Sequence, residues 1–378
     1  MPATTRAAFS ATAGRRRTAS LPSHWLANPG IAAPTAADGL PASADVVVIG
    51  GGVIGVATTY WLARRGVDVV LLEARRLAWG ATGRNAGLML AASNALEDLA
   101  SIHTLLHDES IDAEFEQSGH LALASSVSIW NRIQDEVARR PSTASPLHAL
   151  DRPQCEALLG LRIAPWIPGG RWLPAGAAIH PVRFVLELAE RAHRRGARFV
   201  YPVVVHRIDD DGVVTTRGIV RARDVIVACG SRTPRLVRPT RAILHAHRAT
   251  VCSTQPIPRV FYPGLAIDWG AYYWRQASDG TIVIGGGVAE SNLLATLASV
   301  FPDLPPLEVA RRWTGTMEDA SDGRPLVGRW SPRLWIAAGF GGHGLPPALG
   351  VGAALADSIA TAQPSLLLER FDPARFAR

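Results

Sequence analysis

The sequence contains no lysine, so all 39 residues counted as lysine or arginine are arginine, and the formal net charge is +7. The absence of lysine excludes Schiff-base chemistry and any lysine acting as a catalytic acid or base. The arginines are scattered through every segment, whereas a nucleic-acid-binding protein gathers its cations on one face or stripe. We therefore expect no nucleic-acid partner.

Cysteine is also scarce, with only Cys155, Cys229 and Cys252. Their spacing matches neither a disulfide framework nor a metal-ligand motif, so we expect a reducing, cytoplasmic location and no metal site. One uncharged stretch, residues 46–63, is long enough to span a bilayer, but four glycines interrupt it and its first half is β-branched. This pattern indicates a buried strand, a turn and a helix, so no membrane span is expected.

Acidic residues are absent from the first 37 positions, which include the run Arg15-Arg16-Arg17. A targeting signal with such a run needs an apolar stretch after the arginines, and none follows here. Residues 28–43 are instead rich in proline and alanine. We therefore expect residues 1–43 to form a disordered lead and the folded chain to begin near Asp45.

The rest of the sequence alternates between strand-like and helix-like patterns. We expect strands at residues 45–49, 68–72, 197–205, 224–228 and 334–338, and helices ending near residues 65, 195 and 360. Two other strand-like regions, 119–125 and 248–287, interrupt this alternation, and the second is rich in aromatic residues.

This alternation predicts an α/β fold in which a Rossmann-type domain is interleaved with a second, sheet-dominated domain. The Rossmann-type domain is expected to comprise residues 44–118, 165–240 and 313–370, and the second domain residues 119–164 and 241–312.

The expected strand at 45–49 runs into Gly50-Gly51-Gly52-Val53-Ile54-Gly55, which matches the G-x-G-x-x-G dinucleotide fingerprint. Gly50 permits a tight turn, Gly52 lets backbone amides approach a pyrophosphate, and Gly55 lets helix and strand pack closely. The helix N-terminus stabilises the phosphate charge. Glu73 ends the second strand, where a carboxylate accepts hydrogen bonds from a ribose diol. An acid at this position predicts FAD or NAD rather than NADP.

The segment Gly80-Ala81-Thr82-Gly83-Arg84-Asn85-Ala86-Gly87 resembles the G-A-S-G-R-N-G/A-G pattern of the FAD-dependent amine oxidoreductases. That family includes glycine oxidase, D-amino-acid dehydrogenase and γ-glutamylputrescine oxidase, and it carries the pattern on a loop beside the flavin. Residues 225–231 resemble the family's second FAD strand, with Cys229 as a small packing residue. The resemblance extends over about residues 23–360.

The C-terminal part resembles the family's closing signature in Trp313-Thr314-Gly315, in Asp322-Gly323-Arg324-Pro325-Leu326-Val327-Gly328 and in residues 338–347. Pro346 and Pro347 suit the first turn of a helix. In the family, the N-terminus of that helix points at the flavin edge that gains negative charge on reduction. His343 has either a positional role there or the role of a catalytic base.

The resemblance implies a Rossmann-type FAD-binding domain and a sheet-dominated substrate domain, as in the glutathione-reductase-type fold of glycine oxidase. It also implies non-covalent FAD, because no cysteine follows Cys252 and residues 80–87 contain no histidine. The residues expected to contact the cofactor are Gly50, Gly52, Val53, Ile54, Gly55, Glu73, Ala74, Arg75, Gly80, Ala81, Thr82, Arg84, Asn85, Ala86, Gly87, Val204, Cys229, Gly230, Gly339, Gly341, Gly342, His343, Gly344 and Leu345.

One departure from the family pattern bears on the substrate. Amino-acid oxidases of the family carry an arginine two residues after Trp-x-Gly, which pairs with the substrate carboxylate, whereas this sequence has Met317 and then Glu318. Methionine cannot form the bidentate pair that carboxylate recognition prefers. Either the substrate is an amine without an α-carboxylate, or another arginine such as Arg275 compensates. Glu318 is a candidate partner for a cationic amine, unless both residues simply pack or face solvent.

The family's substrate site is also lined by a tyrosine-containing strand, which residues 272–275 resemble. Strand alternation places Tyr273 and Arg275 on one face and Tyr272 and Trp274 on the other, and the sequence leaves open which face meets the flavin. The candidate catalytic residues are Tyr273, Arg275, Met317 and His343.

Members of the family transfer a hydride from the carbon bearing the amine to flavin N5 and leave an imine. We therefore expect an oxidase for a small amine or amino acid, with molecular oxygen as the acceptor. A dehydrogenase of the same fold that uses a quinone or carrier protein is one alternative, and a non-catalytic flavin-binding sensor is another. A flavin monooxygenase is disfavoured because residues 341–344 lack the Gly-Asp segment of that class. The oligomeric state is left open.

Overall fold

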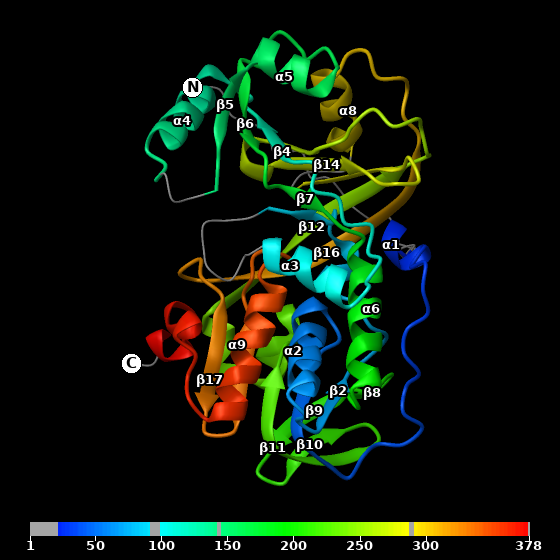
Figure 1. The fold of residues 1–378 in the computed structure, drawn as a ribbon, viewed down its shortest axis with the longest axis vertical. Helices are drawn as coiled ribbons and strands as arrows, with labels where there is room; N and C mark the ends of the chain where they lie inside the picture. The colour runs from blue at the N-terminus through cyan, green and yellow to red at the C-terminus, as the bar shows by residue number, and fades with distance from the viewer. Residues whose placement is uncertain (1–21, 91–98, 142–144, 287–290, 377–378) are drawn as a thin grey trace, which may run out of the picture.

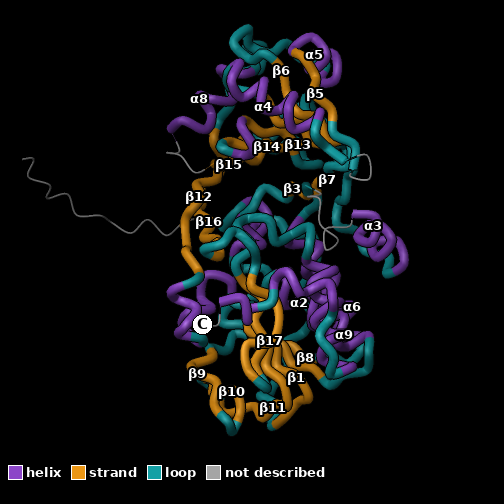
Figure 2. The backbone as a smooth tube through the Cα atoms, turned by 90° about the vertical axis from the view of Figure 1, so that its left-hand side faces the viewer, coloured by secondary structure: helices purple, strands orange, loops and turns teal. Residues whose placement is uncertain are grey.

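The computed structural model describes residues 22–90, 99–141, 145–286 and 291–376. The molecule is elongated, with one sheet and its helices at one end and a second sheet at the other (Figure 1). Two long strands, β12 (Leu244–Thr254) and β16 (Val309–Ala320), run between the two ends along one side (Figure 2).

The first sheet is built from short apolar strands. They are β1 (Ser43–Ile49), β2 (Val69–Leu72), β8 (Arg198–Val200), β9 (Val205–Asp209), β10 (Gly212–Thr215), β11 (Gly218–Val227), β17 (Leu326–Ser331) and β18 (Leu334–Ala338). The order is β17-β18-β11-β1-β2-β8, with β17 antiparallel to β18, the other pairs parallel and the β9–β10 hairpin attached to β11. Residues of β1 and β2 are buried on both faces, as a parallel sheet covered on both sides requires.

Helices α2 (Val53–Arg64), α6 (Pro181–Arg194) and α9 (Ala348–Thr361) cover one face of this sheet (Figure 1). Helix α2 packs against both of the others. Gly352 of α9 permits close contact, because an added Cβ there would lie 2.7 Å from the carbonyl carbon of Ala57 in α2. The tight helix pair fixes the start of α2 against the sheet.

The second sheet mixes parallel and antiparallel pairs. Besides β12 and β16 it contains β4 (His120–Leu123), β5 (His148–Asp151), β6 (Gly169–Leu173), β13 (Gly264–Ile267), β14 (Tyr272–Gln276) and β15 (Ile282–Gly286), in the order β16-β12-β15-β14-β13-β4-β6-β5. Helices α4 (Val127–Ala138), α5 (Arg152–Leu159) and α8 (Ser291–Val300) lie on its outer side (Figure 1).

Shorter elements lie between the two sheets and around their edges. They are α1 (His24–Ala27), α3 (Leu99–Asp108), α7 (Thr233–Leu236), β3 (Leu88–Met89) and β7 (Ala177–Ala178), and the 3₁₀-helix η1 (Ala81–Arg84). β3 pairs with β7.

The strongest local patterns are confirmed. The helix expected at 181–195 is α6, and the strand expected at 334–338 is β18. The hairpin of β9 and β10 closes with Asp209 opposite Gly212, where the sequence carries turn-forming residues.

The expectation of a disordered lead over residues 1–43 is wrong for residues 22–42. Residues 24–27 form α1, Trp25 is fully buried, and its ring packs edge-on against His180 at a centroid distance of 4.9 Å. This segment is held by tertiary contacts of single side chains rather than by a periodic apolar pattern, so its composition resembled that of a disordered chain. Residues 1–21 lie outside the described residues.

The sheets also differ from the expected domain bounds at two places. Strand β6 falls within 165–240 but pairs with β4 and β5 in the second sheet, and β16 crosses the expected boundary at 313 while pairing with β12. Strand patterns reveal buried faces but not which sheet a strand joins, because pairing partners are distant in sequence.

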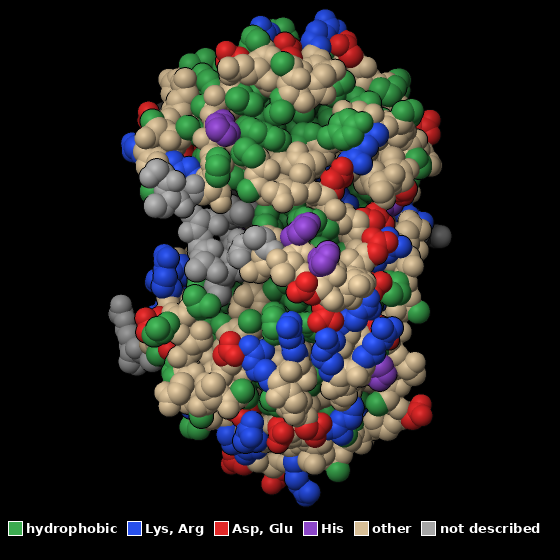
Figure 3. Space-filling view, in the orientation of Figure 1, with side chains coloured by type: hydrophobic (Ala, Val, Ile, Leu, Met, Phe, Trp, Pro, Cys, Tyr) green, Lys and Arg blue, Asp and Glu red, His purple; other side chains and the backbone are tan. Residues whose placement is uncertain are grey.

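Many surface arginines lie beside acids. Blue and red side chains alternate over the helices of the first sheet (Figure 3). Three of the pairs there are Arg65–Asp357, Arg191–Glu187 and Arg195–Glu109. Such pairing neutralises the positive charge locally on this face.

No single helix among the described residues is long and apolar enough to cross a membrane. The helix α9 and residues 366–376, which meet at an angle of 117°, together have the length and apolar composition of a membrane span, but only by these two properties.

Candidate functional site

At two positions around the start of α2, the neighbouring backbone leaves room only for glycine. Gly50 has a φ of +116°, and a Cβ there would lie 2.4 Å from the carbonyl oxygen of Ala228 at the end of β11. A Cβ on Gly55 would lie 1.9 Å from Gly50 O. Helix α2 can therefore begin directly at the carboxyl end of β1, where its unpaired N–H groups gather.

Glu73 follows β2 and closes the opposite side of this turn. Its Oε2 accepts a hydrogen bond from the Gly51 N–H at 2.8 Å, and its Oε1 accepts one from the Arg75 N–H at 2.8 Å. A carboxylate oxygen has two lone pairs, so each oxygen retains acceptor capacity for a ligand. Val203 donates its N–H to Glu73 O at 2.8 Å, which places the half-exposed Val204 beside this corner.

Residues 80–87, here called the cofactor loop, meet the start of α2. Thr82 Oγ1 accepts a hydrogen bond from the Val53 N–H at 3.0 Å. The Asn85 side chain accepts from the Gly87 N–H at 2.7 Å and donates to Thr82 O at 2.9 Å, which braces the loop from within. The structure thus brings together the glycine turn and the loop that the sequence singled out separately.

Three guanidinium groups surround one indole beside the cofactor loop. The Cζ atoms of Arg75, Arg76 and Arg84 lie 5.5, 4.5 and 4.7 Å from the ring centre of Trp79. Burial, together with the charges of Arg75 and Arg76, lowers the pKa of Arg84. None of the three arginines forms an ion pair within the described residues, so the cluster is electropositive and suited to an anion.

The carboxyl ends of β11 and β18 hold a buried acid that sequence reasoning did not assign to this place. Glu318 is 6% exposed, accepts a hydrogen bond from the Gly339 N–H at 3.2 Å, and lies against Gly230. Burial raises the pKa of Glu318 to about 7. Its side chain leaves β16 on the face opposite Met317, so the suggestion that it pairs with a substrate amine near Met317 is wrong.

Cys229 lies beside this acid at the end of β11. Its Sγ donates to Ile49 O at 3.2 Å, and burial raises the pKa of the thiol to about 12. A thiol held protonated in this way packs rather than reacts.

The glycine-rich segment 339–344 folds against β16. A Cβ on Gly341 would lie 2.0 Å from Asp319 Oδ1, and one on Gly342 would lie 2.9 Å from Met317 Sδ. His343 is exposed, with its Nδ1 3.0 Å from Gly341 O. Pro347 is the N-cap residue of α9, which begins one residue later than the expected first turn.

One face of the β12–β16 pair points at both loops. Trp313 donates its Nε1–H to Arg84 O at 2.9 Å, and a Cβ on Gly315 would lie 3.5 Å from Arg84 Cβ. Met317 and Asp319 continue the same face toward segment 339–344 by strand alternation. The cofactor loop and the closing glycines therefore meet over a single strand face.

A histidine–aspartate pair lies on this face and was missed at the level of sequence. His247 Nδ1 lies 3.1 Å from Asp319 Oδ2, and each side chain is about half exposed. Asp319 also lines a cavity of about 420 Å³ together with Gly339, Gly341 and His343. Strand alternation could have placed Asp319 on the same face as Trp313, Gly315 and Met317. It could not have revealed His247, because that residue belongs to a strand about 70 residues earlier.

Tyr273, which is partly buried, and Arg275, which is buried, lie on the face of β14 that looks toward the first sheet. The Tyr273 ring lies over Gly285, and burial raises the pKa of its phenol to about 12. Arg275 is 4% exposed, donates to Gly87 O at 3.3 Å, and stacks on the Trp25 ring at 4.9 Å. The face of β14 that carries Arg275 therefore meets the cofactor loop.

Arg275 does not compensate for the arginine missing at Met317. The register aligns Arg275 through β15 and β12 with Arg311, three strands away and six residues before Met317. Strand spacing and rise put the two residues about 14 Å apart across the sheet and about 20 Å along it. The side chain of Arg275 is also already engaged by Gly87 and Trp25.

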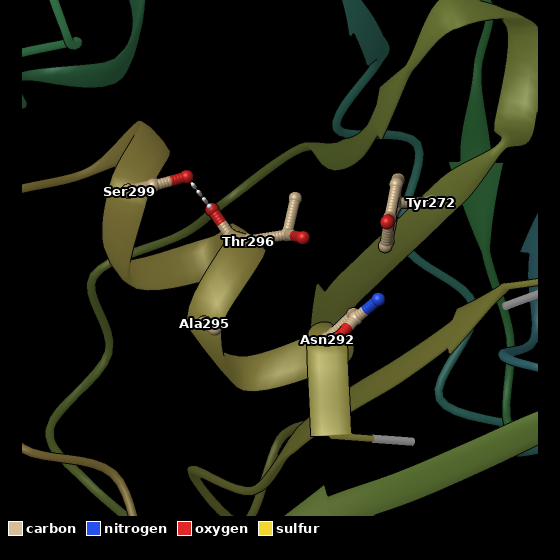
Figure 4. A pocket seen from close by; sticks show the side chains of 5 residues that line it. All are labelled: Tyr272, Asn292, Ala295, Thr296 and Ser299. Carbon is tan, nitrogen blue, oxygen red and sulfur yellow. Dashed lines mark hydrogen bonds between the residues drawn. The ribbon is translucent and has the colours of Figure 1, made fainter. Parts of the chain in front are cut away.

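A second, shallower pocket of about 270 Å³ lies on the other face of β14. It is lined by Tyr272 and four residues of α8, among them Asn292, and Ser299 Oγ donates to Thr296 O at 2.8 Å at its edge (Figure 4). This pocket faces away from the cofactor loop.

The sequence and fold were compared with known proteins. A profile of the family described as FAD dependent oxidoreductase matches residues 45–358. The chain belongs to this family. It is 25% identical to the probable oxidoreductase OrdL of Rhizobium meliloti (strain 1021), over 80% of this chain and 79% of that protein. It is also 25% identical to the gamma-glutamylputrescine oxidoreductase of Escherichia coli (strain K12), over 80% of each.

Other relatives are longer. The chain is 26% identical to the mitochondrial dimethylglycine dehydrogenase of Mus musculus, over 89% of this chain but only 44% of that protein. Solved structures share the fold: glycine oxidase from Bacillus cereus ATCC 14579 has a TM-score of 0.77 and 22% identity, covering 86% of this chain and 98% of its own. L-proline dehydrogenase from P. horikoshii has a TM-score of 0.79 and 24% identity, covering 90% and 99%. This FAD-dependent oxidoreductase thus has the Rossmann-type fold of that group and acts on C–N bonds.

The described residues fit FAD as the cofactor of this oxidoreductase. The glycine turn leaves no room for side chains at the start of α2, Glu73 keeps free lone pairs, and the cluster of Arg75, Arg76 and Arg84 offers cations for a pyrophosphate. Within the described segments no group of three or more His, Cys, Asp or Glu side chains could hold a metal ion.

The buried acid Glu318 predicts a pH dependence of stability for this oxidoreductase. Its pKa is about 7 in the folded chain against an ordinary 4.5, so between these pH values the folded chain binds a proton that the unfolded chain releases. The free energy of unfolding therefore falls as the pH rises through this window, by about 3 kcal/mol in total.

Replacing Glu318→Gln removes this titration. We expect denaturant unfolding at pH 5 and pH 7.5 to show a smaller loss of stability in the variant than in the unchanged protein. Glu308→Gln, which alters an exposed carboxylate, serves as the control and should keep the original pH dependence. Equal pH dependence in the Glu318 variant and the unchanged protein would contradict the assignment.

Proposed function

We propose that this oxidoreductase oxidises the C–N bond of a small amine without an α-carboxylate, with molecular oxygen as the electron acceptor. Bound FAD supplies the acceptor for the hydride that leaves the carbon next to nitrogen. The polypeptide binds the amine, removes its proton and orients its C–H bond.

The strand face around Met317 carries this proposal. From Trp313 to Asp319 and from His245 to Val251, the residues on this face include one carboxylate and two histidines but no arginine. This strand face itself offers no guanidinium for a substrate carboxylate, whereas Asp319 suits a cationic amine. The name gamma-glutamylputrescine oxidoreductase borne by one relative describes a protein that acts on a derivative of the diamine putrescine.

The pair of His247 and Asp319 is proposed to take the proton from the substrate ammonium. An amine must be neutral before its carbon can release a hydride, because a positive nitrogen opposes the developing iminium charge. In the tautomer with the proton on Nδ1, His247 donates to Asp319 Oδ2 across 3.1 Å and leaves Nε2 free to accept. Asp319 then stabilises the imidazolium that forms.

Other side chains are proposed to hold FAD without a covalent bond. Glu73 would accept from the adenosine ribose, the start of α2 would face the pyrophosphate, and segment 339–345 with the cofactor loop would contact the flavin. All three cysteines lie in described segments and none forms a disulfide, which supports the proposed cytoplasmic location. His343 is proposed as a positional residue of the closing glycines.

The first test of the function is optical. The purified protein should show flavin absorption bands, and acid precipitation should release the colour into the supernatant. Addition of an amine without oxygen should bleach the bands, and air should restore them within seconds to minutes. Bleaching that persists in air but is reversed by a quinone would replace the oxidase proposal with the dehydrogenase. Failure of every amine to bleach the flavin would favour a sensor.

A second prediction concerns the residue at the substrate end of β16. Met317→Arg should lower the KM for an α-amino acid about tenfold relative to the matching amine, because a guanidinium can form a bidentate pair with the carboxylate. Met317→Leu is the matched control and should leave the preference for amines unchanged. The substrate proposal is wrong if the unchanged protein already prefers the amino acid.

A third prediction concerns the proton acceptor. His247→Asn should reduce kcat/KM about 100-fold near neutral pH, with recovery at alkaline pH where the amine is neutral in solution. His245→Asn, on the same strand face, is the control and should retain the original pH profile. A parallel loss at all pH values in the His247 variant would argue against proton transfer.

A further inference from the structure

Side chains from outside the cofactor loop hold its carbonyl groups one after another. Ser23 Oγ donates to Gly83 O, and Trp313 Nε1 donates to Arg84 O at 2.9 Å. The next two donors, listed with their acceptors, are Trp25 Nε1 to Asn85 O at 2.7 Å and Arg275 Nη1 to Gly87 O at 3.3 Å. These four donors come from three segments that are far apart in the sequence.

All four donors are buried. Ser23, Trp25, Trp313 and Arg275 are each less than 5% exposed. A buried donor costs free energy unless it is hydrogen-bonded, so each side chain is stable in this place only while the loop carbonyl stays where it is. The donors and the loop therefore fix one another.

Arg275 makes this mutual dependence strongest. Among the described residues it has no ion-pair partner, and its Nε makes no hydrogen bond. Its direct contacts are the carbonyl oxygen of Gly87 and the face of the Trp25 ring at 4.9 Å, while Glu114, Glu116 and Asp279 attract the charge without forming an ion pair. Burial accordingly lowers the pKa of Arg275 to about 10. Among the described residues, the hydrogen-bond acceptor of this buried charge is therefore a carbonyl group of the cofactor loop.

The direction of these hydrogen bonds also determines where the N–H groups of the cofactor loop point. In a planar trans peptide the C=O and the following N–H point in opposite directions. Drawing the carbonyls of residues 83–85 toward Ser23, Trp313 and Trp25 therefore turns the N–H groups of residues 84–86 away from these three donors. It also fixes Thr82, whose Oγ1 accepts from Val53 at the first turn of α2.

We propose that Ser23, Trp25, Trp313 and Arg275 form a clamp that positions the cofactor loop for FAD. Two of these four positioning residues, Ser23 and Trp25, belong to the segment that precedes the matched family region, residues 45–358. The segment around α1 thus contributes side chains that hold the cofactor loop. The clamp rests on FAD binding by the family and not on the proposed substrate.

The clamp is tested by Trp25→Phe in the full chain. Phenylalanine keeps an aromatic face for Arg275 and removes the N–H that holds Asn85 O. We expect the Kd of the apoprotein for FAD to rise about tenfold, because one buried carbonyl loses its partner. Trp166→Phe, at a half-exposed indole in the other half of the molecule, is the matched control and should keep the original Kd.

Trypsin supplies a readout that does not depend on activity. The chain has no lysine, so tryptic sites are arginines, and Arg84 lies within the clamped loop. In the Trp25→Phe apoprotein we expect cleavage after Arg84 to accelerate relative to cleavage after Arg171, which lies within β6 of the second sheet and is cut only when that strand opens. A general loss of stability would accelerate both cuts alike.

Ser23→Ala provides a second variant with a smaller change in volume. It frees Gly83 O and should produce the same two effects in weaker form. The clamp is overturned if both variants bind FAD with the original Kd and show the original ratio of the two cuts. It stands, with the substrate proposal rejected, if both effects appear in a protein whose flavin no amine bleaches.

Discussion

Between β1 and α2 the backbone passes so close to itself that a methyl group on Gly55 would lie 1.9 Å from Gly50 O. This contact forces the helix to start at the carboxyl end of the strand, between the ends of β2 and β11. Glu73, Thr82 and Ala228 are then all brought against the same turn. The cofactor loop takes its position from Thr82, and the long strand β16 takes its position from the loop through Trp313.

Local patterns foretold the parts of this arrangement that depend on neighbours in sequence. The glycine turn, the acid Glu73 and the helix α6 follow from spacing and periodicity, because each requires only a short stretch of chain. The glycines of segment 339–344 were recognised by their resemblance to the family's closing signature. Their close contacts with Met317 and Asp319 in the fold explain why side chains are absent there.

Long-range contacts explain what the sequence did not reveal. His247 and Asp319 meet because β12 and β16 pair in one register, which no local pattern encodes. Trp25 is buried through contacts with Arg275 and His180, so an unpatterned segment is ordered by partners more than 150 residues away. Arg275 was expected on a substrate-lining strand, and its hydrogen bond to Gly87 O joins residues that are 188 apart in the sequence.

Strand β16 carries two tasks on its two faces. Met317 and Asp319 face the closing glycines, while Glu318 between them faces Gly230 and Gly339. Adjacent residues of β16 therefore contact different parts of the molecule. On the proposed assignment, mutation at position 317 changes which amine is accepted, whereas the joint between β11 and β18 depends on Glu318. Substrate preference can therefore change during evolution through one face of β16, while the residues that support cofactor binding through the other face are conserved.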